Sequence, residues 1–144
     1  MNNITLEFDI DTTNADVPLG VKVSLDGVVL HDNSHVTGAY HFSHEFSDDD
    51  GDHELSIEMY GKLPQHTKIS ESGEIVEDSI LLINNIKVDS IDLDQLANQL
   101  FEYHHDFNGT QSPTVDKFYN AMGCNGQAVL KFRSPIYLLL LEIM

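Results

Sequence analysis

Residues 4–10 read ITLEFDI, with an apolar side chain at every second position and a polar one between. Successive side chains of a β-strand point to opposite faces, so this alternation places the apolar residues together on one face. The pattern recurs in VKVSL at residues 21–25 and in LSIEM at residues 55–59. These segments predict strands that share one buried face.

Turn residues separate the predicted strands. Asp26-Gly27 lies between residues 21–25 and the β-branched run at 28–30. A type I′ turn needs positive φ at both central positions, and Asp-Gly favours it, so the sequence predicts a hairpin of antiparallel strands here. A longer extended stretch is expected at residues 35–46, and its inward candidates are Val36, Tyr40, Phe42 and Phe46.

The middle of the chain predicts a further turn at residues 70–74 and a central strand. Residues 80–83 read ILLI, and a run that is apolar on both faces is typical of a strand covered on each side. Two stacked sheets would bury such strands, so the predicted fold is mainly β, an antiparallel β-sandwich of the jelly-roll kind. The predicted core contains Ile4, Leu6, Phe8, Val21, Val23, Leu25, Leu55, Ile57 and Leu82.

The last third of the chain is expected to hold short helices. One could begin near Asp92 with an Asp cap, residues 115–122 are expected to form one or two helical turns, and Pro135 suits the first turn of a helix over 136–144. Residues 127–132 alternate again and predict a strand. The expected organisation is one β-sandwich domain over 1–144, with an extension over about 93–144 packed on it or on a partner.

Composition limits the partners and the compartment. The chain has 24 acidic and 7 basic residues, a formal net charge of −17, which disfavours nucleic acid and anionic membranes. The N-terminus has no basic segment followed by an apolar one, so no signal peptide is expected. The longest apolar run, residues 138–141, is far shorter than the ~20 residues of a membrane helix. Cys124 is the only cysteine, so no intramolecular disulfide can form.

An acidic cluster at residues 48–52 is a candidate calcium loop, because hard cations prefer several oxygen ligands. An EF-hand in this register would need an acid at position 46 and a glutamate at position 57, which here are Phe46 and Ile57. We therefore interpret the cluster as a solvated hairpin tip and expect no metal or cofactor. The alternative is a looser calcium site formed by Asp48, Asp49, Asp50 and Asp52.

Catalytic motifs are absent from the sequence. His104-His105-Asp106 could contribute to a transition-metal site, but no CxxC, no HxxxH on a helix and no third ligand at a fixed spacing accompanies it. Surface or interface histidines are the expected interpretation. Cys124 stands in a turn of small residues, and GxSxG, P-loop and GxGxxG motifs do not occur. No catalytic residue is predicted, and the chain is not expected to be an enzyme.

The end of the chain is apolar around almost the whole circumference of the predicted helix. One interpretation is that this helix closes the core of its own domain, and the other is that it docks on another subunit. We predict partner binding, with formation of an oligomer or of a complex with another protein. The predicted partner-binding residues are Tyr137, Leu138, Leu139, Leu140, Leu141, Ile143 and Met144.

Several segments carry a resemblance to a known family: SHEFSDDD at 43–50 followed by HEL at 53–55, YHHDFNGT at 103–110, DKFYNAMGCNG at 116–126, SPIYL at 134–138, and the predicted strand within 78–91. They resemble small virion-associated proteins of T4-like phages of marine cyanobacteria. The first two thirds of those proteins are similar to the β-sandwich of calcium-dependent xylan-binding carbohydrate modules. The resemblance implies a carbohydrate-module-like sandwich, and it carries over no sugar or metal ligand residue by residue.

The resemblance implies a function of assembly. The chain would be a non-enzymatic virion protein, as a head decoration or a tail or baseplate component, made in the host cytoplasm and bound to other virion proteins and to itself. The alternative is a carbohydrate-binding module for host surface glycans, assisted by calcium. The absence of Trp and the presence of only five Tyr count against a platform for sugar stacking.

Overall fold

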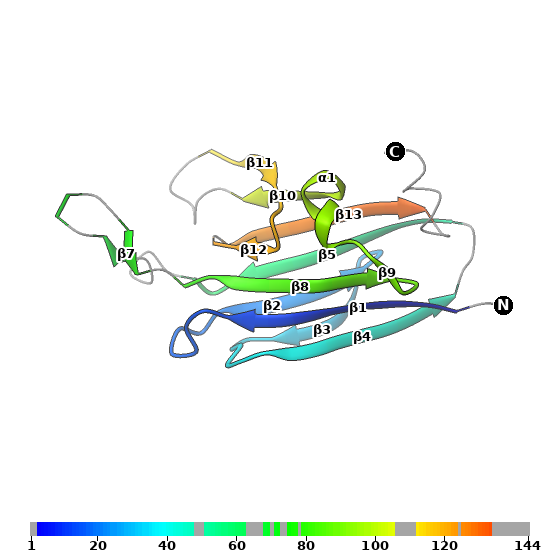
Figure 1. Ribbon diagram of the computed structural model, residues 1–144, viewed down its shortest axis with the longest axis horizontal. Helices are drawn as coiled ribbons and strands as arrows, with labels where there is room; N and C mark the ends of the chain where they lie inside the picture. Colours follow the sequence, from blue (N-terminus) through cyan, green and yellow to red (C-terminus); the bar gives the residue numbers. More distant parts are fainter. Residues whose placement is uncertain are drawn as a thin grey trace.

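The computed structural model describes residues 3–47, 51–62, 68–69, 71–72, 75–77, 79–105, 112–123 and 125–133. These residues form two antiparallel sheets and a separate two-stranded hairpin (Figure 1). The five-stranded sheet has the order β12-β8-β1-β4, with β9 paired to β8. Its strands are β1 (Asn3–Thr12), β4 (Tyr40–Ser47), β8 (Leu81–Val88), β9 (Ile91–Asp92) and β12 (Ala121–Met122).

The second sheet has six strands in the order β11-β10-β13-β5-β2-β3. They are β2 (Gly20–Leu25), β3 (Val28–Asn33), β5 (Asp52–Tyr60), β10 (Phe101–His105), β11 (Thr114–Lys117) and β13 (Gly126–Arg133). The hairpin pairs β6 (Lys68–Ile69) with β7 (Ile75–Glu77) and extends away from both sheets in Figure 1. The prediction of a turn between Ile69 and Ile75 is therefore confirmed.

The core lies between the two large sheets and confirms the period-2 prediction. Eight of the nine predicted core residues are buried, and Leu82 is the exception. Leu82 is half-buried opposite Ala121, whereas its neighbours Leu81 and Ile83 are buried. Strand β8 lies between β1 and β12, so the prediction of a central strand is correct. Its half-buried Leu82 shows that β8 is not covered on both faces. A run that is apolar on both faces cannot itself determine which set of alternate residues points inward.

The Asp26-Gly27 hairpin is confirmed. Asp26 has a φ of 53° and Gly27 a φ of 83°, and the turn joins β2 to β3. The extended stretch expected at residues 35–46 begins only at Tyr40. Val36 and Phe42 are buried as expected, and Tyr40 and Phe46 are partly buried against the core.

The prediction of short helices in the last third is wrong as a description of its fold, because strands β10 to β13 occupy most of it. Residues 115–122, expected to be helical, contribute to β11 and β12, whose pairing with β10 and β8 overrides local propensity. Among the described residues, helical conformation is confined to the 3-10 turn η2 (Asp94–Leu96) and α1 (Ala97–Leu100). The helix predicted at 136–144 lies outside the described residues.

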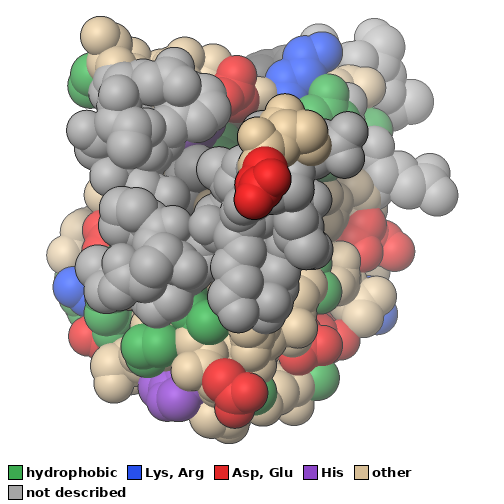
Figure 2. Space-filling view, turned by 90° about the vertical axis from the view of Figure 1, so that its left-hand side faces the viewer, with side chains coloured by type: hydrophobic (Ala, Val, Ile, Leu, Met, Phe, Trp, Pro, Cys, Tyr) green, Lys and Arg blue, Asp and Glu red, His purple; other side chains and the backbone are tan. Residues whose placement is uncertain are grey.

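The surface reflects the acidic composition. At the end of the molecule shown in Figure 2, acidic side chains appear at several places and basic ones at few. Within the described parts of the chain, no helix is long and apolar enough to cross a membrane.

Candidate functional site

The outer face of the six-stranded sheet carries mainly polar side chains, because alternate residues of its strands point away from the core. Strand register places one residue of each strand in a single row across the sheet. This row contains, in spatial order, Val115, His104, Gln127, Glu58, Lys22 and Asp32. A second row contains Lys117, Glu102, Val129, Ser56, Ser24 and Val29. We call these two rows, together with Glu54, Tyr60 and Lys131, the polar face.

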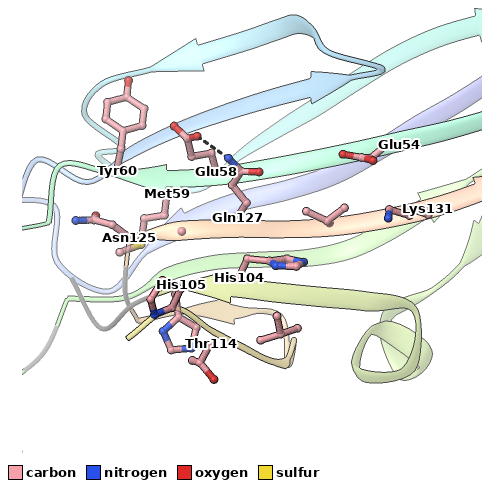
Figure 3. A pocket seen from close by; sticks show the side chains of 14 residues that line it. Glu54, Glu58, Met59, Tyr60, His104, His105, Thr114, Asn125, Gln127 and Lys131 are labelled. Atoms are coloured by element: carbon pink, nitrogen blue, oxygen red, sulfur yellow. Dashed lines mark hydrogen bonds between the residues drawn. The ribbon is translucent and has the colours of Figure 1, made fainter. Parts of the chain in front are cut away.

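An open depression of about 760 Å³ lies on the polar face (Figure 3). Its walls come from β5, β10, β11 and β13 and from the segments that flank them. Such a volume lies within the range of small-molecule binding sites. The lining residues are Glu54, Glu58, Met59, Tyr60, His104, His105, Pro113, Thr114, Val115, Asn125, Gly126, Gln127, Val129 and Lys131.

Hydrogen bonds and close contacts orient polar groups that line this depression or lie beside it. Nε2 of Gln127 donates to Oε1 of Glu58 over 3.2 Å, and the Ser56 hydroxyl donates to Oε1 of Gln127 over 3.3 Å (Figure 3 draws the first). On the neighbouring strand, Nε2 of His104 lies 3.1 Å from a carboxylate oxygen of Glu102. Each of these groups has further donor or acceptor capacity, so the row can bind a ligand rich in hydroxyl groups.

Tyr60, the last residue of β5, is the aromatic member of the polar face. Its hydroxyl donates a hydrogen bond to the carboxylate of Asp32 on β3, and Nζ of Lys22 lies 5.9 Å from the centroid of its ring. The hydrogen bond to Asp32, with partial burial and the negative charges of Asp32 and Glu58, raises the pKa of Tyr60 to about 12. The phenol is therefore neutral at physiological pH.

A buried lysine fixes one wall of the depression. Lys62 is 3% exposed, and its ammonium donates to the backbone oxygen of Gly123 over 2.6 Å. The amide of Asn125 bonds both backbone groups of Lys62, at 3.0 and 2.8 Å. A Cβ on Gly126 would lie 2.3 Å from the backbone oxygen of His104, so glycine is required where β13 begins beside β10. These contacts hold the start of β13 against the end of β5.

The candidate calcium residues are only partly described. Asp48, Asp49 and Asp50 lie outside the described residues, and Asp52 is exposed at the start of β5. No group of three or more His, Cys, Asp or Glu side chains among the described residues is arranged to hold a metal ion. Instead, carboxylates such as Asp26 and Asp116 contact histidines, at 2.7 Å to His53 and 2.6 Å to His105. The described residues therefore do not fit a calcium site.

The two adjacent histidines of β10 point to opposite faces of the sheet. His104 is exposed on the polar face, as a surface histidine should be. The side chain of His105 is only 7% exposed and lies 2.6 Å from a carboxylate oxygen of Asp116, beside the depression. Asp106, Cys124 and the predicted partner-binding residues 137–144 lie outside the described residues.

The sequence did not identify the polar face as a site. Its polar residues, such as Lys22 and Glu58, were visible as the solvent side of alternating strands. Their common surface depends on the strand order, which places β13 and β10 beside β5 although they are distant in the chain. The local signal for this face in the sequence was a polar residue at every second position of several predicted strands.

The comparisons with known proteins concern the fold. No protein-family model and no curated protein matches the sequence. Two solved structures are similar to it over most of both chains. The first is a selenomethionine form of vCBM60, from work on circular permutation between two families of calcium-dependent carbohydrate-binding modules. Its TM-score is 0.53 at 11% identity, covering 88% of this chain and 89% of that one.

The second similar structure is vCBM60 in complex with galactobiose. Its TM-score is 0.50 at 13% identity, covering 90% of this chain and 97% of that one. At these identities the likeness concerns the fold alone, and the resemblance to the phage family has no counterpart in these comparisons. The chain therefore has a mainly β, two-sheet fold like that of these carbohydrate-binding modules.

Proposed function

We propose that the chain is a non-catalytic carbohydrate-binding module and that the polar face binds the glycan. The observation that carries the proposal is the row of oriented polar side chains on the polar face, with Gln127 held between Ser56 and Glu58. The likeness of the fold to carbohydrate-binding modules, one of them in complex with galactobiose, supports it. The likeness of the fold supports glycan binding more than it supports virion assembly.

The geometry of the row suits a saccharide. Neighbouring strands lie roughly 4.8 Å apart, so the row offers a polar group at about that interval across the sheet. A sugar ring carries hydroxyl groups at comparable intervals, and each hydroxyl both donates and accepts. Glu58 supplies an acceptor, the ammonium of Lys22 supplies donors, and Gln127 supplies both.

The charge of the polar face favours a neutral glycan. Three lysines, Lys22, Lys117 and Lys131, stand among four acids. The acids are Asp32, Glu54, Glu58 and Glu102. This mixture provides no concentrated positive charge for sulfate or uronate groups, and the net charge of −17 opposes an anionic polymer. In the setting that the sequence resemblance implies, the ligand would be a neutral glycan of the host surface.

Isothermal titration calorimetry with neutral oligosaccharides, galactobiose first, tests this proposal. The double variant Glu58→Ala/Gln127→Ala removes the central acceptor and amide, and it should weaken binding about tenfold or more. Glu45→Ala is the control, because Glu45 is exposed on β4 of the other sheet. If the wild-type chain binds no neutral glycan on a broad array, the proposed function is wrong.

The calcium dependence of the similar modules is not carried over to this chain. We propose that the glycan instead binds through the protein's own donors and acceptors on the polar face. Glycan affinity should then be equal with and without a chelator.

Virion assembly remains the second candidate function, and the sequence resemblance supports it together with the apolar segment 137–144. Val28 and Val29, which are exposed at the β2–β3 hairpin, are further apolar contacts for a partner. Deleting residues 139–144 tests assembly: a folded truncated chain that no longer associates supports the hypothesis, and one that associates normally contradicts it. Absence of the chain from purified particles by mass spectrometry would also contradict it.

A further inference from the structure

Gly20 and Tyr60 are paired across β2 and β5, and the aromatic ring occupies the space that a side chain at position 20 would need. A Cβ on Gly20 would lie 2.4 Å from Cζ and 2.5 Å from Cε2 of Tyr60. Gly20 has no positive φ, unlike Gly27 and Gly61, so its backbone conformation does not require glycine. The space required by the ring is what excludes a larger residue.

Two further contacts hold the ring in this position. The hydroxyl donates to Asp32 on β3, so the side chain spans the width of β2. The ammonium of Lys22, two residues after Gly20 on the same face, lies 5.9 Å from the ring centroid. An exposed tyrosine ordinarily samples several rotamers, and ordering it on binding costs free energy. Here the backbone of β2, Asp32 and Lys22 have already ordered the ring.

The ring of Tyr60 also borders the depression. Tyr60 is half-buried and lines the cavity, and its ring is seen face-on in Figure 3. Among the described lining residues it is the only phenyl-type ring. An aromatic face carries partial negative charge and offers a large, rigid contact area. The C–H groups on one side of a pyranose are apolar and carry slight positive charge, so they complement such a face.

We propose that Tyr60 is the stacking platform for one pyranose residue of the bound glycan, and that Gly20 and Asp32 are positioning residues for its ring. The proposal rests on the proposed function and adds a ligand class: neutral pyranosides whose C–H groups gather on one face, as galactosides do because O4 is axial. The ammonium of Lys22, beside the ring, would then bind a hydroxyl group at the rim of the stacked sugar.

Calorimetric titration of the full chain with galactobiose, or with the tightest neutral ligand found on the array, tests the platform. Tyr60→Ala should weaken binding about tenfold or more, since the stacking contact is lost. Tyr60→Phe keeps the ring and loses only the bond to Asp32, so it should lose less affinity than Tyr60→Ala. Tyr119→Ala is the matched control, because Tyr119 is 65% exposed and does not line this depression.

Gly20→Ala tests positioning separately from contact. The added methyl must displace the ring, so affinity should fall in the wild-type background and change little in the Tyr60→Ala background, where no ring remains to displace. Equal losses in both backgrounds would contradict the positioning role. Circular dichroism confirms that each variant is folded; if Gly20→Ala does not fold, Asp32→Asn replaces it, with the same expected dependence on Tyr60.

Spectroscopy provides a readout independent of stability. The chain has no Trp, so its intrinsic fluorescence comes from tyrosine. Glycan should change that emission in the wild type and not in Tyr60→Ala. If the wild type binds no neutral glycan, both proposals fail. If Glu58→Ala/Gln127→Ala loses binding and Tyr60→Ala keeps full affinity, the proposed function stands and the platform is wrong.

Discussion

The carboxylate of Asp94 accepts a hydrogen bond of 2.8 Å from the backbone N–H of Asn85, where β8 departs from regular register with β1. Its other oxygen accepts the N–H of Ile86, also over 2.8 Å. Asn85 has a φ of 55°, as residues of a β-bulge can, and a bulge leaves backbone groups outside the ladder. The carboxylate satisfies these two donors and stabilises the bulge.

Asp94→Ala should therefore lower the free energy of unfolding by about 2–4 kcal/mol, because it leaves two backbone donors without their charged acceptor. Asp94→Asn keeps one acceptor and should lose less. Urea unfolding measures both variants. Asp16→Ala, at an exposed carboxylate in the loop after β1, is the control and should change stability by less than about 0.5 kcal/mol. An Asp94→Ala variant as stable as the wild type would contradict the assigned role.

Phe8 is fully buried in β1, and its ring stacks on that of Phe42 with centroids 4.9 Å apart. Phe8→Ala should cost about 3–5 kcal/mol, from lost apolar burial and from the cavity left in a packed core. Chemical denaturation monitored by circular dichroism measures the loss. Val29→Ala, at a β3 residue that is 53% exposed, is the control and should cost less than about 0.5 kcal/mol. A loss as small as that of the control would place Phe8 outside the core.

Asp9 gives the fold a defined dependence on pH. Its carboxylate lies 2.7 Å from Nδ1 of His41 and accepts a 2.7 Å hydrogen bond from Asn85, and these contacts lower the pKa of Asp9 from its ordinary value of 3.8. A carboxyl with a lower pKa in the folded state adds stability that is fully present above pH 3.8. That stability is lost as the pH falls through the folded-state value.

Asp9→Asn removes this titration. The wild type should be more stable than the variant at about pH 6, and the difference should be smaller at about pH 3, because the pH has then fallen below the ordinary value of 3.8 towards the lower folded-state pKa of Asp9. Urea unfolding at the two pH values measures it. Because Asp9 is partly exposed, added salt should also reduce the difference. A difference that grows on acidification would contradict the assignment.

Local pattern was sufficient to predict much of the sandwich. In β1, β2 and β5, and in the β13 strand of Ala128, Leu130 and Phe132, strict alternation identified the buried residues correctly. It failed where pattern alone is ambiguous: in β8 it chose Leu82 over Leu81 and Ile83. It also failed at β11 and β12, which are short and depend on pairing with strands elsewhere in the chain.

The candidate site could not be predicted from local sequence pattern either, because it also depends on strand pairing. Gly20 and Tyr60 are 40 residues apart in number and become neighbours only through the pairing of β2 with β5. No periodicity marks a glycine that is needed to accommodate a ring from another strand. The absence of Trp counts against a stacking platform in the sequence, but one well-positioned tyrosine can supply the required aromatic face.

Calcium should bind the chain no more tightly than millimolar. The EF-hand register places Phe46 and Ile57 where ligands are required, and Ile57 is fully buried in the core. The nearby Asp26 is already engaged, since it contacts His53 at 2.7 Å and accepts the backbone N–H of Glu54 at 2.8 Å. Calorimetric titration of calcium into chelator-treated protein measures the affinity directly.

The decisive comparison is between the wild type and Asp50→Ala. Equal, weak heats for both would agree with the prediction, because tight calcium binding requires several oxygen ligands held in one geometry. A micromolar site that disappears in Asp50→Ala would contradict it and identify the acidic cluster as a metal site. Repeating the galactobiose titration with calcium and with chelator then distinguishes the acidic cluster from the polar face as the glycan site. If the glycan binds the polar face through Tyr60 and Gln127, as proposed, its affinity should not depend on calcium.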